Sequence, residues 1–191
     1  VAPLNTGINS TIEDQNNALR IRAPGVFPTG VNQPFSISAW IYLRATCNAI
    51  FGNAGTPIAS TEFLLKAENG AYRVTGWGGF RDSGGSAKYN EWALVTVTYD
   101  GTTIKLYENE ALRIDHPQSL TITYDEFTVG SLGGACGGGG RMAYDDVRFY
   151  NRAISEDEIA ELIVSRDGIR YNSNHNVPEY FDSNRWVAMT P

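Results

Sequence analysis

A short stretch rich in aromatic, charged and glycine residues is the part of the sequence best suited to bind a sugar. Trp77, Phe80 and Tyr89 supply aromatic rings, and Arg81 and Asp82 supply polar heads for hydroxyl groups. Sugar sites combine aromatic platforms, which stack on the apolar faces of sugar rings, with a few planar polar groups. Five glycines between positions 76 and 85 let a ligand approach the backbone. We therefore expect a carbohydrate site here; the alternative is a loop whose tryptophan covers an edge of the core.

Carboxylates and histidines do not fall into a catalytic pattern. Retaining glycoside hydrolysis needs two carboxylates about 5 Å apart, which on a strand means acids at alternate positions. Glu108 and Glu110 have that spacing but fall in a predicted turn, and the acidic run 156–158 opens a predicted helix, where it complements the helix dipole. His116 and His175 lie in a predicted turn and in the tail. The sequence has no nucleophile-elbow, zinc-protease or phosphate-loop motif, so we expect no catalysis.

Asp145 is the candidate metal ligand. Alternation along a predicted strand at 144–150 puts Asp145 in phase with Val147 and Phe149, which face the core. A buried carboxylate must be hydrogen-bonded, paired or bound to a metal. We favour a hydrogen-bonded structural carboxylate and keep calcium as the alternative, since calcium takes about six to eight oxygen ligands and only Asp146 lies beside it.

Three more aromatic residues are expected to be structural. Trp40 and Tyr42 alternate with the apolar residues of the strand at 35–43 and so face away from them. Trp92 opens another apolar strand. We interpret all three as packing residues.

The composition excludes several classes of protein. Hydrophobic residues make up 42% and aromatic residues 12%, enough for a core, and only 19% of residues are charged. Lys and Arg number 15 against 21 Asp and Glu, giving a formal charge of −6, so nucleic acid is not an expected partner. No run approaches the roughly 20 apolar residues that span a bilayer, so membrane insertion is not expected either.

Short alternating segments and closely spaced turn residues predict an all-β, two-sheet antiparallel sandwich with one short helix near the C-terminus. The helix is predicted at 155–165, because Ser155 and Glu158 form a capping box ahead of an apolar stripe. We divide the chain into an N-terminal arm at 1–17, one domain at 18–165 and an aromatic tail at 166–191 that packs on the domain or on a partner. The predicted strands are 18–22, 35–43, 49–51, 62–66, 71–77, 92–99, 103–107, 111–114, 119–123, 126–130 and 144–150.

Three segments carry a resemblance to a known family. In their order and spacing, 35–41, 92–101 with its return strand, and 145–155 resemble the laminin G-like, concanavalin A-like jelly roll, a family that also contains the pentraxins. Members commonly bind glycans, often with calcium, and usually sit outside the cell or on virions. The resemblance therefore implies a carbohydrate-binding or adhesion domain whose partner is a glycan or glycoprotein, with Ca²⁺ as the candidate cofactor, in an extracellular or virion-surface setting. Because the sequence shows no catalytic pair, we expect this domain to be non-catalytic.

The resemblance also places Cys47 and Cys136 in loops near one end of the sandwich, and so implies a disulfide between them; two free thiols are the alternative. Two other functions remain open. A virion or filament subunit would self-associate through residues 1–17 and 166–191, which a lone domain does not need. A polysaccharide-degrading enzyme of the same fold would require a site that the motifs do not reveal.

Overall fold

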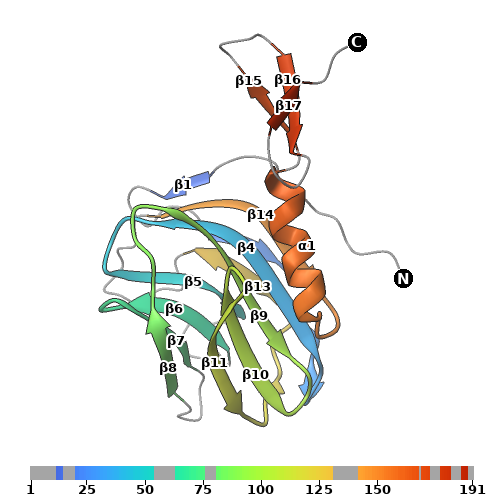
Figure 1. Cartoon of the computed structure of the whole chain (residues 1–191). Helices are drawn as coiled ribbons and strands as arrows, with labels where there is room; N and C mark the ends of the chain where they lie inside the picture. The colour runs from blue at the N-terminus through green and yellow to red at the C-terminus, as the bar shows by residue number, and fades with distance from the viewer. Residues whose placement is uncertain are drawn as a thin grey trace. The chain divides into compact units, whose positions relative to one another are not determined.

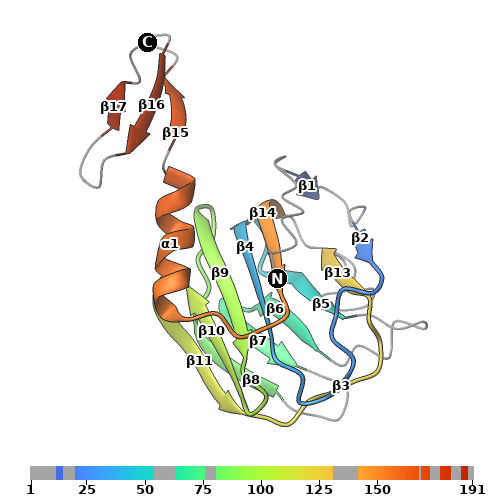
Figure 2. The ribbon, with the colours of Figure 1, turned by 90° about the vertical axis from the view of Figure 1, so that its right-hand side faces the viewer.

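The structure is a computed structural model that describes residues 12–14, 20–53, 63–75, 81–130, 142–167, 169–172, 177–181 and 186–188. The chain divides into two compact units, Val1–Ile154 and Ser155–Pro191. The first unit contains two six-stranded antiparallel sheets, drawn in blue to yellow-orange in Figures 1 and 2. The two-sheet sandwich that the sequence predicts is confirmed.

The first sheet has the order β1-β14-β4-β9-β10-β11. Its strands are β1 (Ile12–Asp14), β14 (Met142–Tyr150), β4 (Phe35–Leu43), β9 (Trp92–Tyr99), β10 (Thr103–Glu108) and β11 (Ala111–Pro117). β1 comes from the predicted arm, and its three residues pair with Met142–Tyr144.

The second sheet has the order β2-β13-β5-β6-β7-β8 and faces the first sheet in Figure 2. Its strands are β2 (Arg20–Ala23), β13 (Phe127–Gly130), β5 (Cys47–Asn53), β6 (Leu64–Glu68), β7 (Ala71–Thr75) and β8 (Arg81–Ser86). A small two-stranded sheet joins β12 (Thr121–Ile122) to β3 (Gly30–Val31).

Alternate residues of the central strands fill the space between the two sheets. On β4 the inward row is fully apolar, and it packs with the inward residues of β9 and β6. Phe35 is at the centre of an aromatic cluster, with ring centroids 4.8 Å from Phe27, 5.2 Å from Phe63 and 6.2 Å from Phe149. The inward residues of β4 are Phe35, Ile37, Ala39, Ile41 and Leu43.

A β-bulge interrupts the pairing of β14 with β4 and corrects one prediction. Tyr144 pairs with Ile41 and Asp145 with Trp40, but the next paired residue is Arg148, opposite Ser38. The inserted residue, Asp146, has a left-handed φ of 48°. Asp145 therefore shares the outer face with Trp40, and the prediction that it faces inward with Val147 and Phe149 is wrong, because the bulge shifts the alternation.

The two sheets approach each other closely where β8 meets β11 (Figures 1 and 2). A Cβ atom on Gly84 would overlap the carbonyl oxygen of Arg113, and one on Gly85 would lie 2.7 Å from Cδ of Arg113. Arg113 is itself the extra residue of a bulge, since Leu106 pairs with Ile114 and Tyr107 with Leu112. These glycines therefore serve the contact between β8 and β11, which is a different role from the ligand approach that we predicted for the glycines of this segment.

The second unit begins with the predicted helix, α1 (Glu156–Asp167). The capping box is formed: the Ser155 amide donates to Oε2 of Glu158 at 2.9 Å, and the Glu158 amide donates to Oγ of Ser155 at 3.2 Å. The tail then forms a three-stranded antiparallel sheet of β15 (Ile169–Asn172), β16 (Val177–Phe181) and β17 (Trp186–Ala188). The one helix that the structure describes is not long and apolar enough to cross a membrane.

Candidate functional site

The predicted sugar-binding stretch lies around the connection between β7 and β8. Trp77 and Phe80 fall outside the described residues, so their role stays a prediction. Arg81 and Asp82 are the first two residues of β8, opposite Thr75 and Val74 of β7. Their role in sugar binding also stays a prediction.

Tyr89, the last residue of that predicted site, lies between β8 and β9. Its side chain is partly buried and packs against the hydrophobic core. Burial raises the pKa of the Tyr89 phenol above its ordinary value of 10.0. The role of Tyr89 in sugar binding stays a prediction.

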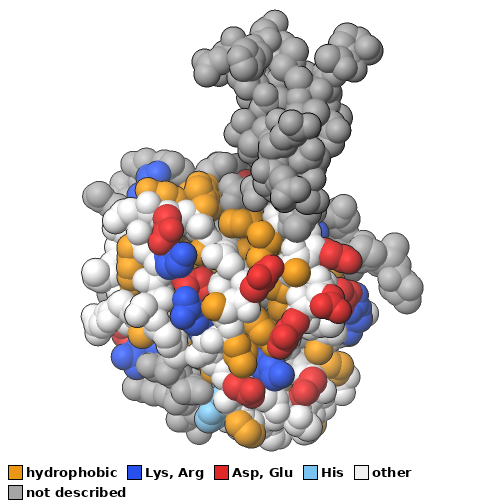
Figure 3. Space-filling view, in the orientation of Figure 1, with side chains coloured by type: hydrophobic (Ala, Val, Ile, Leu, Met, Phe, Trp, Pro, Cys, Tyr) orange, Lys and Arg blue, Asp and Glu red, His pale blue; other side chains and the backbone are white. Residues whose placement is uncertain are grey.

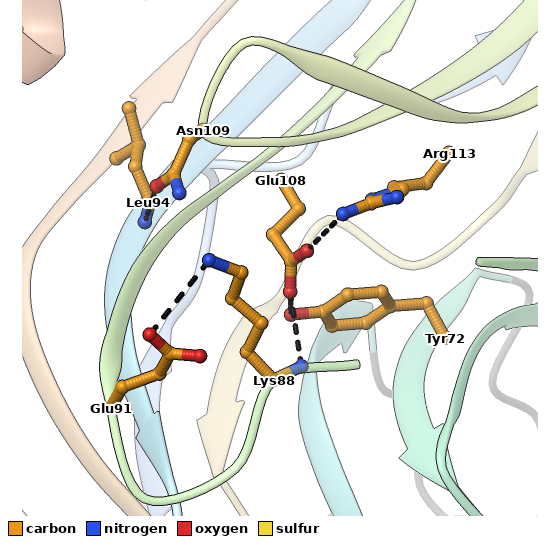
Figure 4. A network of polar contacts seen from close by, with 7 residues as sticks. All are labelled: Tyr72, Lys88, Glu91, Leu94, Glu108, Asn109 and Arg113. Atoms are coloured by element: carbon orange, nitrogen blue, oxygen red, sulfur yellow. Dashed lines mark hydrogen bonds and ion pairs between the residues drawn. The ribbon is translucent and has the colours of Figure 1, made fainter. Parts of the chain in front are cut away.

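Glu108 is a buried carboxylate that accepts three hydrogen bonds (Figure 4). Glu108 alternates along β10 with the core residues Ile104 and Leu106, so its side chain lies between the two sheets. The Tyr72 hydroxyl donates to Oε1 at 2.8 Å, and the Lys88 amide donates to the same oxygen at 3.1 Å. Nη2 of Arg113 donates to Oε2 at 2.7 Å. Tyr72 comes from the second sheet and Arg113 from the first, so Glu108 links the two sheets.

Some glycosidases use a tyrosine hydroxyl as the nucleophile that attacks the sugar. Here the Glu108 side chain is 0% exposed, and Tyr72 is 0% exposed as well. Desolvation, followed by the charge of Glu108 and the hydrogen bond to it, raises the pKa of Tyr72 far above its ordinary value. The phenol therefore stays protonated and out of reach of a substrate, and this cluster serves to hold the sheets together.

The hairpin turn beside this cluster is tied to β9. Asn109 has a left-handed φ of 54°. Its Oδ1 accepts the Leu94 amide at 3.0 Å, and its own amide donates to the Leu94 carbonyl at 2.7 Å. Figure 4 shows this contact together with the nearby ion pair of Lys88 and Glu91, whose charged atoms lie 3.8 Å apart.

An aromatic pair with a neighbouring arginine lies on the outer face of the first sheet. Tyr42 of β4 and Trp92 of β9 are directly opposite each other, with ring centroids 5.7 Å apart in an edge-to-face arrangement. Cζ of Arg44 lies 5.1 Å from the centre of the Tyr42 ring. Both rings are partly exposed, and Arg44 is exposed. We call Tyr42, Trp92 and Arg44 the aromatic patch.

The aromatic patch was missed by the sequence analysis, which interpreted its rings as packing residues. A packing role fits Trp40, which is only 8% exposed. It fits Tyr42 and Trp92 less well, because both side chains are partly exposed. The signal was present in the alternation: both rings are out of phase with the core rows of their strands, and Arg44 follows Tyr42 at i+2.

The remaining candidate residues are placed as follows. Among the described residues, no group of three or more His, Cys, Asp and Glu side chains could hold a metal ion, and Asp145 as a calcium ligand stays a prediction. His116 lies within β11, opposite Ile104, rather than in a turn. Cys47 opens β5, where its Sγ is 4.0 Å from Oε1 of Glu68. Cys136 and His175 lie outside the described residues, so the disulfide stays a prediction.

The fold and the sequence together define the class of protein. A laminin G family model, described as the concanavalin A-like lectin/glucanases superfamily, matches residues 13–160, well over half of the chain. The chain belongs to this superfamily, as the three resembling segments indicate. No curated protein sequence matches the chain.

Solved structures support the fold. A sialidase from Trypanosoma rangeli superposes with a TM-score of 0.59 at 17% identity, over 71% of this chain and 23% of the sialidase. The ligand-binding domain of botulinum neurotoxin serotype D, solved in complex with N-acetylneuraminic acid, superposes with a TM-score of 0.65 at 15% identity, over 97% of this chain and 54% of that domain. The chain thus spans about a quarter of the sialidase and about half of the neurotoxin domain.

Proposed function

We propose that the chain is a carbohydrate-binding domain that recognises a glycan without catalysing a reaction. The aromatic patch carries this proposal. Two rings from neighbouring strands reach solvent beside an exposed guanidinium, and aromatic surface next to a planar polar group is what sugar rings bind. Membership of a lectin and glucanase superfamily and the likeness to a domain solved with N-acetylneuraminic acid support the proposal.

The absence of catalysis is part of this proposal. The Tyr72–Glu108 pair, whose chemistry best suits attack on a sugar, is sealed between the sheets, and both carboxylate oxygens accept hydrogen bonds. Over the described part of the face in Figure 3, hydrophobic side chains reach the surface among acidic and basic ones. This mixed surface suits a glycan better than a phosphate backbone, which needs clustered Lys and Arg.

The experiment is a glycan array followed by titration of the best ligand against single-site variants. Trp92→Ala should weaken binding about tenfold or more, since stacking on an aromatic ring and burial of its surface are worth about 1–3 kcal/mol. Trp92→Phe should recover part of the affinity. The melting temperature of each variant shows whether the sandwich is intact.

A matched variant, Trp77→Ala, tests the site predicted from the sequence. Loss of binding in Trp77→Ala with normal binding in Trp92→Ala would move the site to the β7–β8 connection. If no glycan on the array binds the wild-type chain, the proposed function is wrong.

The proposal also covers where the chain is located and whether copies of it associate. We propose that it works outside a cell or on a virion surface, where members of this superfamily meet glycans. Self-association through residues 1–17 and 166–191 is the alternative use of the fold. The pairing of β1 with β14 within one chain is an observation against a purely intermolecular role for the arm.

A further inference from the structure

We propose that Asn69 is a site of spontaneous covalent modification, at which the side-chain amide is lost as ammonia and aspartate or isoaspartate takes its place. Asn69 and Gly70 form the turn between β6 and β7 and are the one Asn-Gly pair in the sequence. The inference is separate from the proposed function, because this turn belongs to the second sheet and the aromatic patch to the first.

The reacting groups of the turn are open to water. Asn69 is exposed, and its carboxamide forms no hydrogen bond with the residues that the structure describes. A Cβ atom at Gly70 would meet no heavy atom within 4 Å, so the space where a side chain would lie is empty. Glycine therefore leaves its own nitrogen unshielded, and the two groups can meet whenever the backbone allows it.

The reaction needs the Gly70 nitrogen to bond to Cγ of Asn69. In that step the side-chain nitrogen of Asn69 and the proton of the Gly70 nitrogen leave together as ammonia, and a five-membered cyclic imide remains. Water then opens the imide at one of its two carbonyl groups. One opening gives aspartate. The other gives isoaspartate, in which the main chain runs through the side-chain carbonyl group and is one methylene longer.

The folded turn holds the two reacting atoms apart. Both φ angles are left-handed, 52° at Asn69 and 83° at Gly70, as in a two-residue type I′ turn. The first central residue of such a turn has a ψ of about 30°, which directs the following nitrogen away from the side chain. The Asn69 amide donates to the Thr46 carbonyl at 2.8 Å, and the Ala87 amide donates to the Gly70 carbonyl at 2.9 Å. Both turn residues are thus fixed, and the reaction has to wait until the turn opens locally.

The two products differ in what they do to the turn. Aspartate keeps the length of the main chain and tolerates a left-handed φ, so the turn can form again around it. Its added charge is next in sequence to Glu68, whose carboxylate lies 3.1 Å from Nζ of Lys66 and 3.1 Å from Nε of Arg73. Isoaspartate lengthens the main chain, so the hydrogen bonds with Thr46 and Ala87 cannot both be kept.

Loss of the hydrogen bond between Ala87 and Gly70 would affect the buried cluster around Glu108. Ala87 is buried, and the next residue, Lys88, donates its amide to Oε1 of Glu108 at 3.1 Å. The Gly70 carbonyl therefore helps to hold the segment that carries this donor. We expect the isoaspartate form to unfold more easily than the unmodified chain, and the aspartate form to keep nearly all of its stability.

The test is to age the purified wild-type chain at mildly alkaline pH, both folded in buffer and unfolded in guanidinium chloride, and to map the products by mass spectrometry. Labelling with an isoaspartyl methyltransferase distinguishes isoaspartate from aspartate. Asn90 is the matched control: it is exposed, has a left-handed φ of 59° and donates its amide to the Leu43 carbonyl, but Glu91 follows it. We expect Asn69 to be modified faster than Asn90 in both states. Its modification should be about tenfold or more slower in the folded than in the unfolded chain, because only the open turn reacts.

The two modified forms are then separated by chromatography and unfolded in urea. The isoaspartate form should unfold at a lower urea concentration, and the aspartate form should match Asn69→Asp. Asn69→Gly keeps a left-handed turn without the carboxamide and should age without loss of stability. Modification at Asn69 no faster than at Asn90, equal rates in the folded and unfolded chains, or an isoaspartate form as stable as wild type would each overturn the inference.

Discussion

Gly84 of β8 lies against the main chain of Arg113 in β11, with no room for a side chain between them. A Cβ atom at position 84 would overlap the Arg113 carbonyl oxygen and lie 2.5 Å from Cγ1 of Ile114. The two strands belong to different sheets, so this contact closes one edge of the sandwich. The neighbouring Glu108 cluster joins the sheets by hydrogen bonds at the same edge (Figure 4).

Replacement of Gly84 by alanine should destabilise the domain strongly. The added methyl group meets backbone, which cannot move aside as a flexible side chain can, and overpacking costs about 1–3 kcal/mol or more. Urea unfolding measures the loss. Gly25→Asn is the control, because position 25 has open space around it and a left-handed φ of 74° that asparagine tolerates. Equal stability of Gly84→Ala and wild type would contradict the close approach of β8 to β11.

Removal of the Tyr72 hydroxyl should cost about 1–3 kcal/mol of unfolding free energy, because Oε1 of buried Glu108 loses a donor. Glu108→Gln should cost more, since Arg113 then keeps a charge without its partner. A double-mutant cycle of Tyr72→Phe and Glu108→Gln should show a coupling energy well above zero. Additive losses would mean that the two side chains do not interact.

Alkaline pH should destabilise the domain through Tyr72. Its folded-state pKa lies far above the ordinary value of 10.0, so the stability that depends on the protonated phenol is fully present below about pH 10 and is lost as the pH rises beyond it. In the unfolded chain the same phenol ionises near pH 10. Urea unfolding at pH 8 and pH 11 should show a smaller loss in Tyr72→Phe than in wild type. An equal loss in both would show that Tyr72 is not the group that titrates.

Asn109→Gly should lower the unfolding free energy by about 1 kcal/mol, because the Leu94 amide loses its acceptor while the left-handed turn is preserved. Asn69→Gly provides the comparison. Asn69 also has a left-handed φ, 52°, but its side chain makes no such bond to the described residues. Thermal unfolding of both variants separates the hydrogen bond from the turn conformation, and equal losses would remove the role assigned to Oδ1 of Asn109.

The predicted disulfide between Cys47 and Cys136 can be tested by measuring the intact mass of the chain after alkylation. Alkylation of the folded, unreduced chain should leave Cys47 and Cys136 unmodified if the predicted disulfide forms, and reduction should then make both reactive. The bridge would close a loop of about 90 residues, worth on the order of 4 kcal/mol in the chain-entropy model. Two alkylated thiols without reductant would rule the disulfide out.

The strands with regular alternation could be predicted from the sequence. β4 and β9 have the bounds that were predicted, and α1 begins within one residue of its predicted start, because its capping box is a local signal. β8 was missed, since a strand with Gly84 and Gly85 lacks the side chains that mark a strand; its role depends on β11, which lies elsewhere in the sequence.

The candidate site could be predicted only in part. The sequence shows that aromatic residues are present, but which of them reach solvent depends on packing between distant segments. Trp92 and Tyr42 are 50 positions apart and become neighbours only through the pairing of β4 with β9. Asp145 was placed on the wrong face because a single inserted residue, Asp146, cannot be recognised from a regular pattern of alternation.

The bulge in β14 also bears on how copies of the chain can associate. Among the described residues, β1 pairs only with Met142–Tyr144, and no strand pairs with the rest of β14 on the side away from β4. Asp146 and Arg148 form a two-bond ion pair there, with contacts of 2.8 and 2.6 Å. A twisted, charged stretch is a poor template for a strand from another molecule. A filament built by strand exchange would therefore have to use a different sheet edge. Copies of the chain held close together on one surface should not pair with one another through the free edge of β14.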